Sequence, residues 1–168
     1  MNNNVMDNEI EAETGRKIQL CTFRLAGRLF GVDILTVKEI NTETNFTEIF
    51  HAPKQIVGYV NIRGQVHLVL DLRMLLGFTW KDPDKESRVV IFKQNIGESF
   101  GALVDKIGDI IEVSEDQIEA YGAQDDAQAA MEDSWKSRNL VVGVCKLEKD
   151  LLVVLNAKSF LGTFGQKQ

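Results

Sequence analysis

The chain has 168 residues, an apolar content of 44% and a formal net charge of −6, values typical of one globular domain or of two small lobes sharing a core. The negative charge argues against binding to nucleic acid phosphates or to an anionic membrane surface. Two cysteines are too few for a disulfide framework or a metal cluster, and no apolar run is long enough to cross a bilayer. The sequence therefore predicts a cytoplasmic protein without a metal or a cofactor.

The first fifteen residues contain no Lys or Arg and no apolar stretch, which excludes a signal peptide and predicts a disordered acidic tail at 1–15. Short runs with β-strand character follow. Cys21, Phe23 and Leu25 alternate with polar residues, and Ala26-Gly27 is typical of a tight turn. Comparable runs separated by turn residues continue to residue 155, which indicates an all-β barrel or sandwich.

Two stretches of the sequence occur twice. Phe30-Gly31 recurs 70 residues later as Phe100-Gly101, and segment 58–77 recurs 85 residues later as segment 143–162. Further pairs at these displacements are Val37 with Ile107, Ile40 with Ile110, Val60 with Cys145, and Leu70 with Leu155. Such long periods favour two similar lobes over a solenoid.

Each copy of the second stretch ends with helix-terminus signals. Asp71 and Asn156 are typical helix N-caps, and Gly77 and Gly162 suit the left-handed residue after a helix. We therefore expect one short helical turn in each lobe, the second forming a short C-terminal helix before a flexible tail at 163–168.

Two long loops are expected, at 79–86 and at 120–138. The second belongs to an acidic stretch at 112–135 and contains a segment, 127–135, with the composition of a short helix. A solvated surface explains this acidity, and a docking surface for a basic partner is the open alternative.

One enzyme motif is present in the sequence. Segment 97–101 matches the G-x-S-x-G pattern that places a nucleophilic serine, here Ser99, on a strand-to-helix turn. A β-type run follows Ser99, however, and both histidines precede it, whereas the triad order of that fold puts the histidine after the serine. The two histidines show no metal spacing, and His67 is expected to be half-exposed on a strand, with its ring pointing away from the face of Val66 and Leu68.

Several linked motifs resemble the CheW-type chemotaxis coupling (adaptor) protein family. The resemblance covers residues 18–161 and departs at His67 and Leu68, where relatives usually have an aliphatic residue and a proline. The matching segments are Gly58 with Asn61-Ile62-Arg63-Gly64, Asp71-Leu72-Arg73, Phe30-Gly31-Val32-Asp33-Ile34, Val37-Lys38-Glu39-Ile40, Ala52-Pro53, 101–109 and 114–118.

The resemblance implies one domain at 16–162 made of two interlinked, five-stranded SH3-like barrels around a pseudo-twofold axis. It also implies a non-catalytic adaptor between a chemoreceptor cytoplasmic tip and the regulatory domain of a chemotaxis histidine kinase. The receptor would lie in an apolar groove with polar anchors, and the expected contacts are Val37, Glu39, Ile40, Arg63, Val104 and Ile107. For the kinase, the expected contacts are Pro53, Gly64, Gln65 and Val66.

The repeat adds weight to Arg63, because the second copy has Glu148 at the equivalent position and the fold therefore does not require an arginine. Glu39 is its expected partner by resemblance. Two alternatives stay open: a specialised CheW-like scaffold or competitor in a motility or other chemosensory-like pathway, and a small serine hydrolase that uses Ser99.

Overall fold

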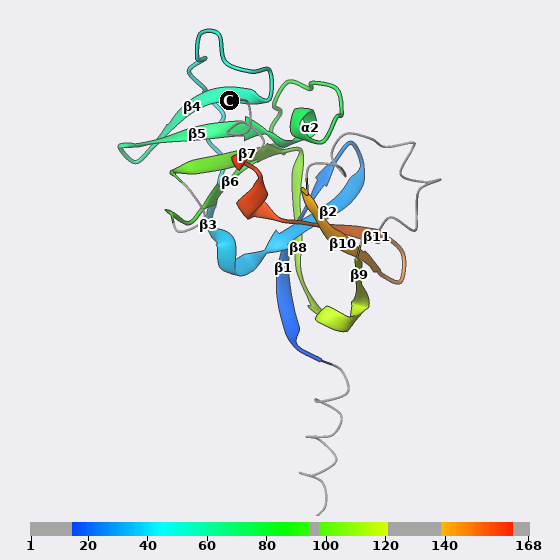
Figure 1. Cartoon of the computed structure of the whole chain (residues 1–168). Helices are drawn as coiled ribbons and strands as arrows, with labels where there is room; N and C mark the ends of the chain where they lie inside the picture. Colours follow the sequence, from blue (N-terminus) through cyan, green and yellow to red (C-terminus); the bar gives the residue numbers. More distant parts are fainter. Residues whose placement is uncertain (1–14, 95–97, 121–138, 163–168) are drawn as a thin grey trace, which may run out of the picture.

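The computed structural model describes residues 15–94, 98–120 and 139–162, which form two sheets (Figure 1). The larger sheet has six strands in the order β8 (Lys106–Ser114), β1 (Lys17–Leu25), β2 (Arg28–Asp33), β11 (Leu151–Leu155), β10 (Val141–Lys146) and β9 (Ile118–Ala120). The smaller has five, in the order β3 (Val37–Asn41), β6 (Arg88–Phe92), β7 (Phe100–Val104), β5 (Gln65–Asp71) and β4 (Ile56–Ile62). The two-lobed, mostly β fold is confirmed, with β9 as a sixth strand in one lobe.

Each sheet combines strands from both copies of the repeat. In the larger sheet, β2 of the first copy runs parallel to β11 of the second, and Phe30 lies opposite Val153. In the smaller sheet, β5 of the first copy runs parallel to β7 of the second, and Leu68 lies opposite Phe100. These pairings are equivalent, because Phe30 and Phe100 differ by 70 positions and Leu68 and Val153 by 85. The lobes are therefore interlinked by exchange of strands.

A strand irregularity also occurs in both lobes at the same repeat position. The register of β4 against β5 shifts between Ile56 and Gly58, and that of β10 against β11 shifts between Val141 and Gly143. A Cβ at Gly58 would overlap the carbonyl oxygen of Thr47, and one at Gly143 would overlap that of Glu119. Another backbone passes too close for a side chain, which explains the glycine in both copies.

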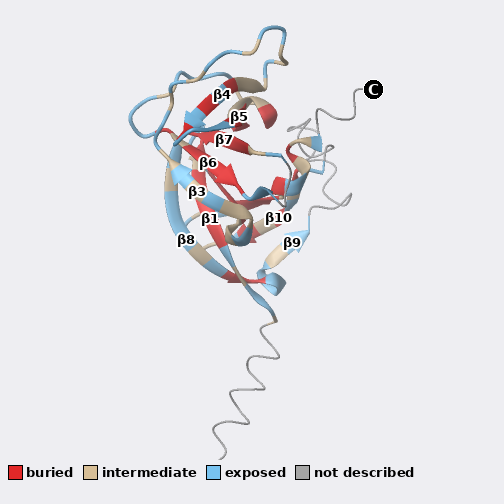
Figure 2. Ribbon diagram, turned by 90° about the vertical axis from the view of Figure 1, so that its left-hand side faces the viewer, coloured by how far each residue is buried: buried red, intermediate tan, exposed pale blue. Residues whose placement is uncertain are grey.

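The buried apolar residues form three clusters, and Figure 2 shows buried strand segments in both lobes. One cluster lies in the interior of the larger sheet and a second in the interior of the smaller sheet. The third and largest combines residues of both sheets. Phe23 stacks with Phe30 in one lobe and Phe92 with Phe100 in the other, and Phe160 meets Phe92 edge-on. Truncating a buried phenylalanine of this kind to alanine typically costs about 3–5 kcal/mol.

Short helical turns end both hairpins, as the caps predicted. Asp71 accepts hydrogen bonds from the amides that begin α2 (Leu72–Leu75), and Asn156 caps the 3₁₀ turn η6 (Ala157–Ser159). Gly77 has a φ of +89°, which confirms its left-handed conformation. For Gly162 that prediction is wrong, because the residue is helical and its φ is not positive.

Two further 3₁₀ turns connect strands: η1 (Ile34–Thr36) leads from β2 of the larger sheet to β3 of the smaller, and η3 (Glu115–Gln117) joins β8 to β9 within the larger sheet. Segment 79–86 is a loop, as predicted. The predictions for the tails at 1–15 and 163–168, and for a helix at 127–135, concern segments that lie almost wholly outside the described residues.

Candidate functional site

An ion pair joins the two edge strands of the smaller sheet. Arg63 lies in the turn after β4 with a φ of +53°, and its Nη2 donates a hydrogen bond to Oε2 of Glu39 on β3. The predicted contact between these residues is thus confirmed. The pKa of the Glu39 carboxyl is lowered from its usual value, chiefly by the hydrogen bond from Arg63 and next by a hydrogen bond from Asn41. The Arg63 side chain is 70% exposed, so the pair presents a charged, accessible group.

The other lobe has no counterpart of this ion pair. The positions equivalent to Glu39 and Arg63 are Asp109 and Glu148, and two acidic residues cannot form one. A lobe of the same topology therefore folds without it. An exposed pair adds only about 0–1 kcal/mol to stability, so this pair contributes little to folding.

The apolar residues expected in the groove differ in accessibility. Ile40 on β3 is 40% exposed, whereas Val37 and Ile107 are half-buried against the core between the lobes. Val104 is buried in that core with 1% exposure, so it supports the surface from below and offers no contact area. Sequence reasoning missed Ile110, which is 60% exposed on β8, although its displacement of 70 from Ile40 was a usable signal.

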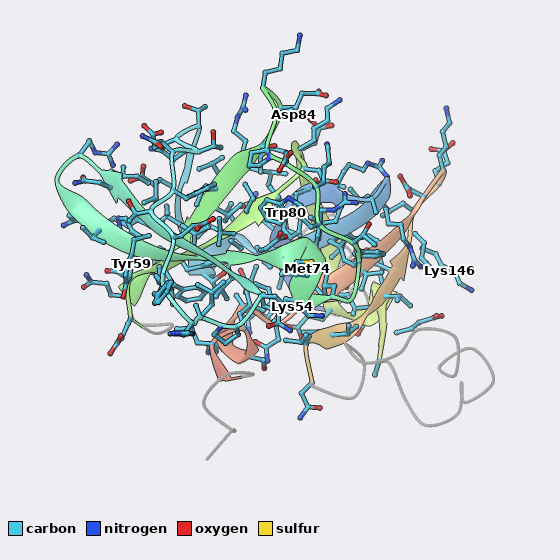
Figure 3. The ribbon with its side chains drawn as sticks, turned by 90° about the horizontal axis from the view of Figure 1, so that it is seen from above. Lys54, Tyr59, Met74, Trp80, Asp84 and Lys146 are labelled. Carbon is cyan, nitrogen blue, oxygen red and sulfur yellow. The ribbon has the colours of Figure 1, made fainter. Side chains whose placement is uncertain are left out.

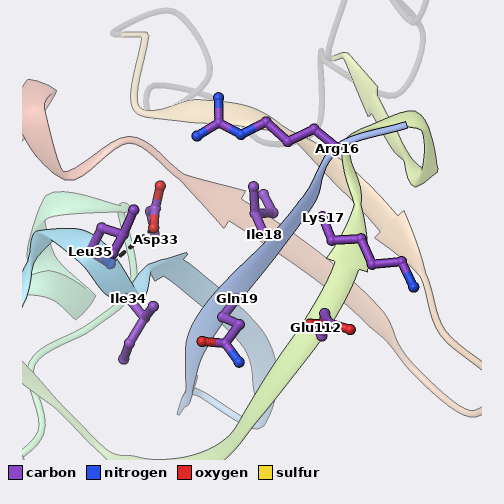
Figure 4. A pocket seen from close by; sticks show the side chains of 8 residues that line it. All are labelled: Arg16, Lys17, Ile18, Gln19, Asp33, Ile34, Leu35 and Glu112. Carbon is purple, nitrogen blue, oxygen red and sulfur yellow. Dashed lines mark hydrogen bonds between the residues drawn. The ribbon is translucent and has the colours of Figure 1, made fainter. Parts of the chain in front are cut away.

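A hollow of about 240 Å³ lies between β1, β8 and η1, and it was not predicted (Figure 4). Figure 4 shows Asp33, Ile34 and Leu35 on one side and Ile18 and Gln19 of β1 on the other. A second hollow, of about 380 Å³, shares Ile18 and Asp33 with the first and extends to η6. Leu35 is 64% exposed at the rim. These residues form a shallow, partly apolar surface where β2 leaves the larger sheet for β3.

Three of the four residues expected to meet a kinase lie at the tip of the β4–β5 hairpin, Gly64 in the turn and Gln65 and Val66 at the start of β5. Gly64 has a φ of +86°, and its amide donates a hydrogen bond to Oδ1 of Asn61, which closes the turn. Gln65 and Val66 are exposed, Val66 by 56%. Pro53 is half-buried and lies in the loop before β4.

Two exposed aromatic residues in this region were missed as candidate contacts. Tyr59 is 44% exposed on β4, on the same face as Asn61 and Val66, and Figure 3 shows it on this hairpin, well apart from Asp84. Phe50 is 87% exposed in the loop between β3 and β4, and its ring contacts that of His51 in a tilted arrangement with the centroids 4.4 Å apart. The alternation in β4 predicted an outward Tyr59, but no sequence pattern distinguished Phe50.

The structure gives Ser99 no catalytic setting. Ser99 leads directly into β7 and not into a helix, and its carbonyl oxygen accepts a hydrogen bond from the amide of Leu68 at 3.1 Å. Among the described residues, no hydrogen bond joins its side chain to His51 or His67. The strand-to-helix turn that the hydrolase alternative requires is therefore contradicted.

His67 is also placed differently from the prediction. Its ring points away from the face of Leu68, as expected, but the residue is only 4% exposed. The opposite face of β5 lies in the interior of the smaller sheet, not in solvent. In the described part of the chain, no group of three His, Cys, Asp or Glu side chains could hold a metal ion, and no helix is long and apolar enough to cross a membrane.

Comparison with known proteins identifies similar sequences over most of the chain. The family model described as "CheW-like domain" matches residues 19–163. The "Probable chemotaxis protein CheW" of Rhizobium etli is 35% identical over 101 residues, which are 60% of this chain and 64% of that protein. The "Chemotaxis protein CheW" of Rhizobium meliloti is 33% identical over 114 residues, 68% of this chain and 73% of that protein.

The "Chemotaxis protein CheW" of Bacillus subtilis extends the similarity to 80% of this chain and 85% of that protein, at 29% identity. Among solved structures, the fold is similar to "scaffolding protein TtCheW from Thermoanaerobacter tengcongensis", with a TM-score of 0.71 and 26% sequence identity. That alignment covers 84% of this chain and 90% of the other.

Proposed function

The chain belongs to the CheW-like domain family of chemotaxis scaffold proteins, and from this membership we propose that it couples the cytoplasmic tips of chemoreceptors to a chemotaxis histidine kinase. It acts as a non-catalytic adaptor in the cytoplasm and is recruited to membrane-associated receptor arrays. The similar proteins are named for chemotaxis, and the solved one is described as a scaffold.

The proposal depends on one observation above others, the ion pair between Glu39 and Arg63. It lies at the surface, links two edge strands, and has no equivalent in the other lobe. The receptor surface combines this pair with exposed Ile40, the next residue of β3, and with Val37 and Ile107, which are half-buried against the core between the lobes. An amphipathic helix can bury its apolar face on such residues while its polar groups meet the charges at the edge.

The kinase surface is the tip of the β4–β5 hairpin. Gly64 places no side chain on the turn, Gln65 offers an exposed polar group, and Val66 offers an exposed apolar group beside it. Pro53, in the loop before β4, completes the proposed contacts. Because the hairpin and the receptor surface meet at Arg63, a substitution there affects at least one of the two partners.

The test is a capture experiment with the full chain, a receptor cytoplasmic-tip fragment and the regulatory domain of a chemotaxis histidine kinase. The variants are wild type, Arg63→Ala and Lys81→Ala. Lys81 is a matched control, because it forms an exposed ion pair with Asp84 at 3.0 Å, away from the hairpin (Figure 3).

Wild type and Lys81→Ala are expected to capture both partners, and Arg63→Ala is expected to lose at least one. If folded wild type captures neither partner, the adaptor proposal fails. In that case a specialised scaffold or competitor in another pathway becomes the function to test.

A further inference from the structure

A histidine occupies an apolar core at the end of the smaller sheet nearest the β4–β5 turn. His67 lies opposite Val60 of β4, and its Nδ1 is buried without a hydrogen-bond partner. Burial disfavours the charged imidazolium and is the largest cause that lowers the pKa of His67. A buried polar atom without a partner destabilises the fold, so this residue needs an explanation.

The repeat shows that the fold does not require a histidine at this position. The residue 85 positions later is Leu152, which is completely buried in the corresponding core of the larger sheet. The strand pairing is equivalent, since Leu152 lies opposite Cys145 as His67 lies opposite Val60. Leucine fills this site without an unpaired nitrogen. Packing alone therefore does not account for His67.

Three charged groups act on His67, and two of them, Glu39 and Arg63, belong to the proposed receptor surface. The third is Lys38, which precedes Glu39 on β3. Glu39 lies opposite Ile91, a residue of the same apolar core as Val60, which faces His67. The neighbouring strands β4 and β7 contain no charged residue. Lys38 and Arg63 disfavour a protonated imidazole, and Glu39 favours it. Glu39 already accepts a hydrogen bond from Arg63. A positive charge on His67 would therefore attract the carboxylate that Arg63 holds.

We propose that His67 makes the Glu39–Arg63 contact, and partner binding at it, sensitive to pH. The effect on partners rests on the proposed function, whereas the effect on the ion pair does not. Near pH 7.5 the neutral ring packs as Leu152 does in the other lobe. In acid the ring takes up a proton, draws Glu39 away from Arg63, and loosens the attachment of β3 to the hairpin.

The direction of the effect follows from proton linkage. Because the pKa of His67 is lowered in the closed protein, an opened or unfolded form takes up the proton first, at a pKa of about 6.5. The closed form is fully favoured above that pH and loses stability as the pH falls below it. The opening equilibrium changes by up to about tenfold per pH unit until the lowered pKa is reached.

The first test follows the full chain by NMR from pH 7.5 to 5.5 without any partner. The imidazole of His67 is expected to titrate below about pH 6.5, and the side-chain NH signal of Arg63 is expected to shift with it. In His67→Leu, or in His67→Val if the first variant does not fold, the Arg63 signal is expected not to shift. An Arg63 signal with the same pH profile with and without His67 overturns the proposal.

The second test measures the affinity for a receptor cytoplasmic-tip fragment at pH 7.5 and 5.5. The same fragment is used for wild type, His67→Leu and His51→Gln, the last being a control at the exposed histidine. Wild type and His51→Gln are expected to lose affinity about tenfold, and His67→Leu less than twofold. Equal losses in all three variants contradict the inference. Absence of binding at both pH values contradicts the proposed function instead, and the NMR test still decides the role of His67.

Discussion

Replacement of Arg63 by alanine is expected to separate binding from folding. The Arg63 side chain is 70% exposed, and an ion pair this open to solvent contributes at most about 1 kcal/mol to the free energy of unfolding. The backbone φ of +53° costs alanine about as much as arginine, because both have a Cβ. For a chain of this size the midpoint of thermal unfolding is therefore expected to fall by less than about 4 °C.

The loss of affinity is expected to be larger than the loss of stability. Truncating a charged side chain in an interface removes its own interactions and also leaves the group that it contacted on the binding partner unpaired. Together these effects typically weaken binding by at least tenfold, or about 1.4 kcal/mol. Titration calorimetry with each partner measures this loss. A double-mutant cycle with Arg63→Ala and Glu39→Ala shows whether the two residues contribute to the affinity independently or together. An unchanged affinity, or a fall in the midpoint above about 10 °C, would refute the reasoning.

Three further changes test the fold around the site. Arg73→Ala breaks a partly buried pair with Asp105, whose side chain is 17% exposed, and is expected to cost about 2–4 kcal/mol in urea unfolding; a loss below about 1 kcal/mol contradicts this. Gly101→Ala brings a Cβ to 2.8 Å from two side chains, whereas the nearest atom to the equivalent Gly31 would be at 3.3 Å. Gly101→Ala is therefore expected to destabilise the fold by about 1–3 kcal/mol more than Gly31→Ala, and equal unfolding midpoints of the two variants would contradict this. Ser99→Ala is expected to leave partner affinity unchanged, and a measurable loss would reopen its role.

Local patterns predicted the features that depend on neighbouring residues. The caps at Asp71 and Asn156 follow from side-chain hydrogen bonds two residues along the chain, and the outward face of Tyr59 follows from strand alternation. The contact between Glu39 and Arg63 joins residues 24 positions apart, and it was expected from the family resemblance and not from periodicity.

The features that were missed depend on how whole elements pack. Displacements of 70 and 85 are the same whether a strand pairs within its own copy or with the other, so the repeat alone did not predict the strand exchange, and only the family resemblance implied interlinked barrels. Alternation identifies two faces of β5 but not which one becomes an interior, which is why His67 was expected to be half-exposed and is instead buried. Val104 was likewise expected to line the groove, but it lies in the core between the lobes.

The most direct test of the adaptor proposal is the mass of the complex formed when the full chain is mixed with both partners at once. Light scattering after size exclusion measures it. We expect one species containing the chain, the receptor fragment and the kinase regulatory domain, because Ile40 and Val66 can be covered by different partners. Two binary complexes that exclude one another, with no species containing all three, would contradict the proposal that this chain joins receptor to kinase.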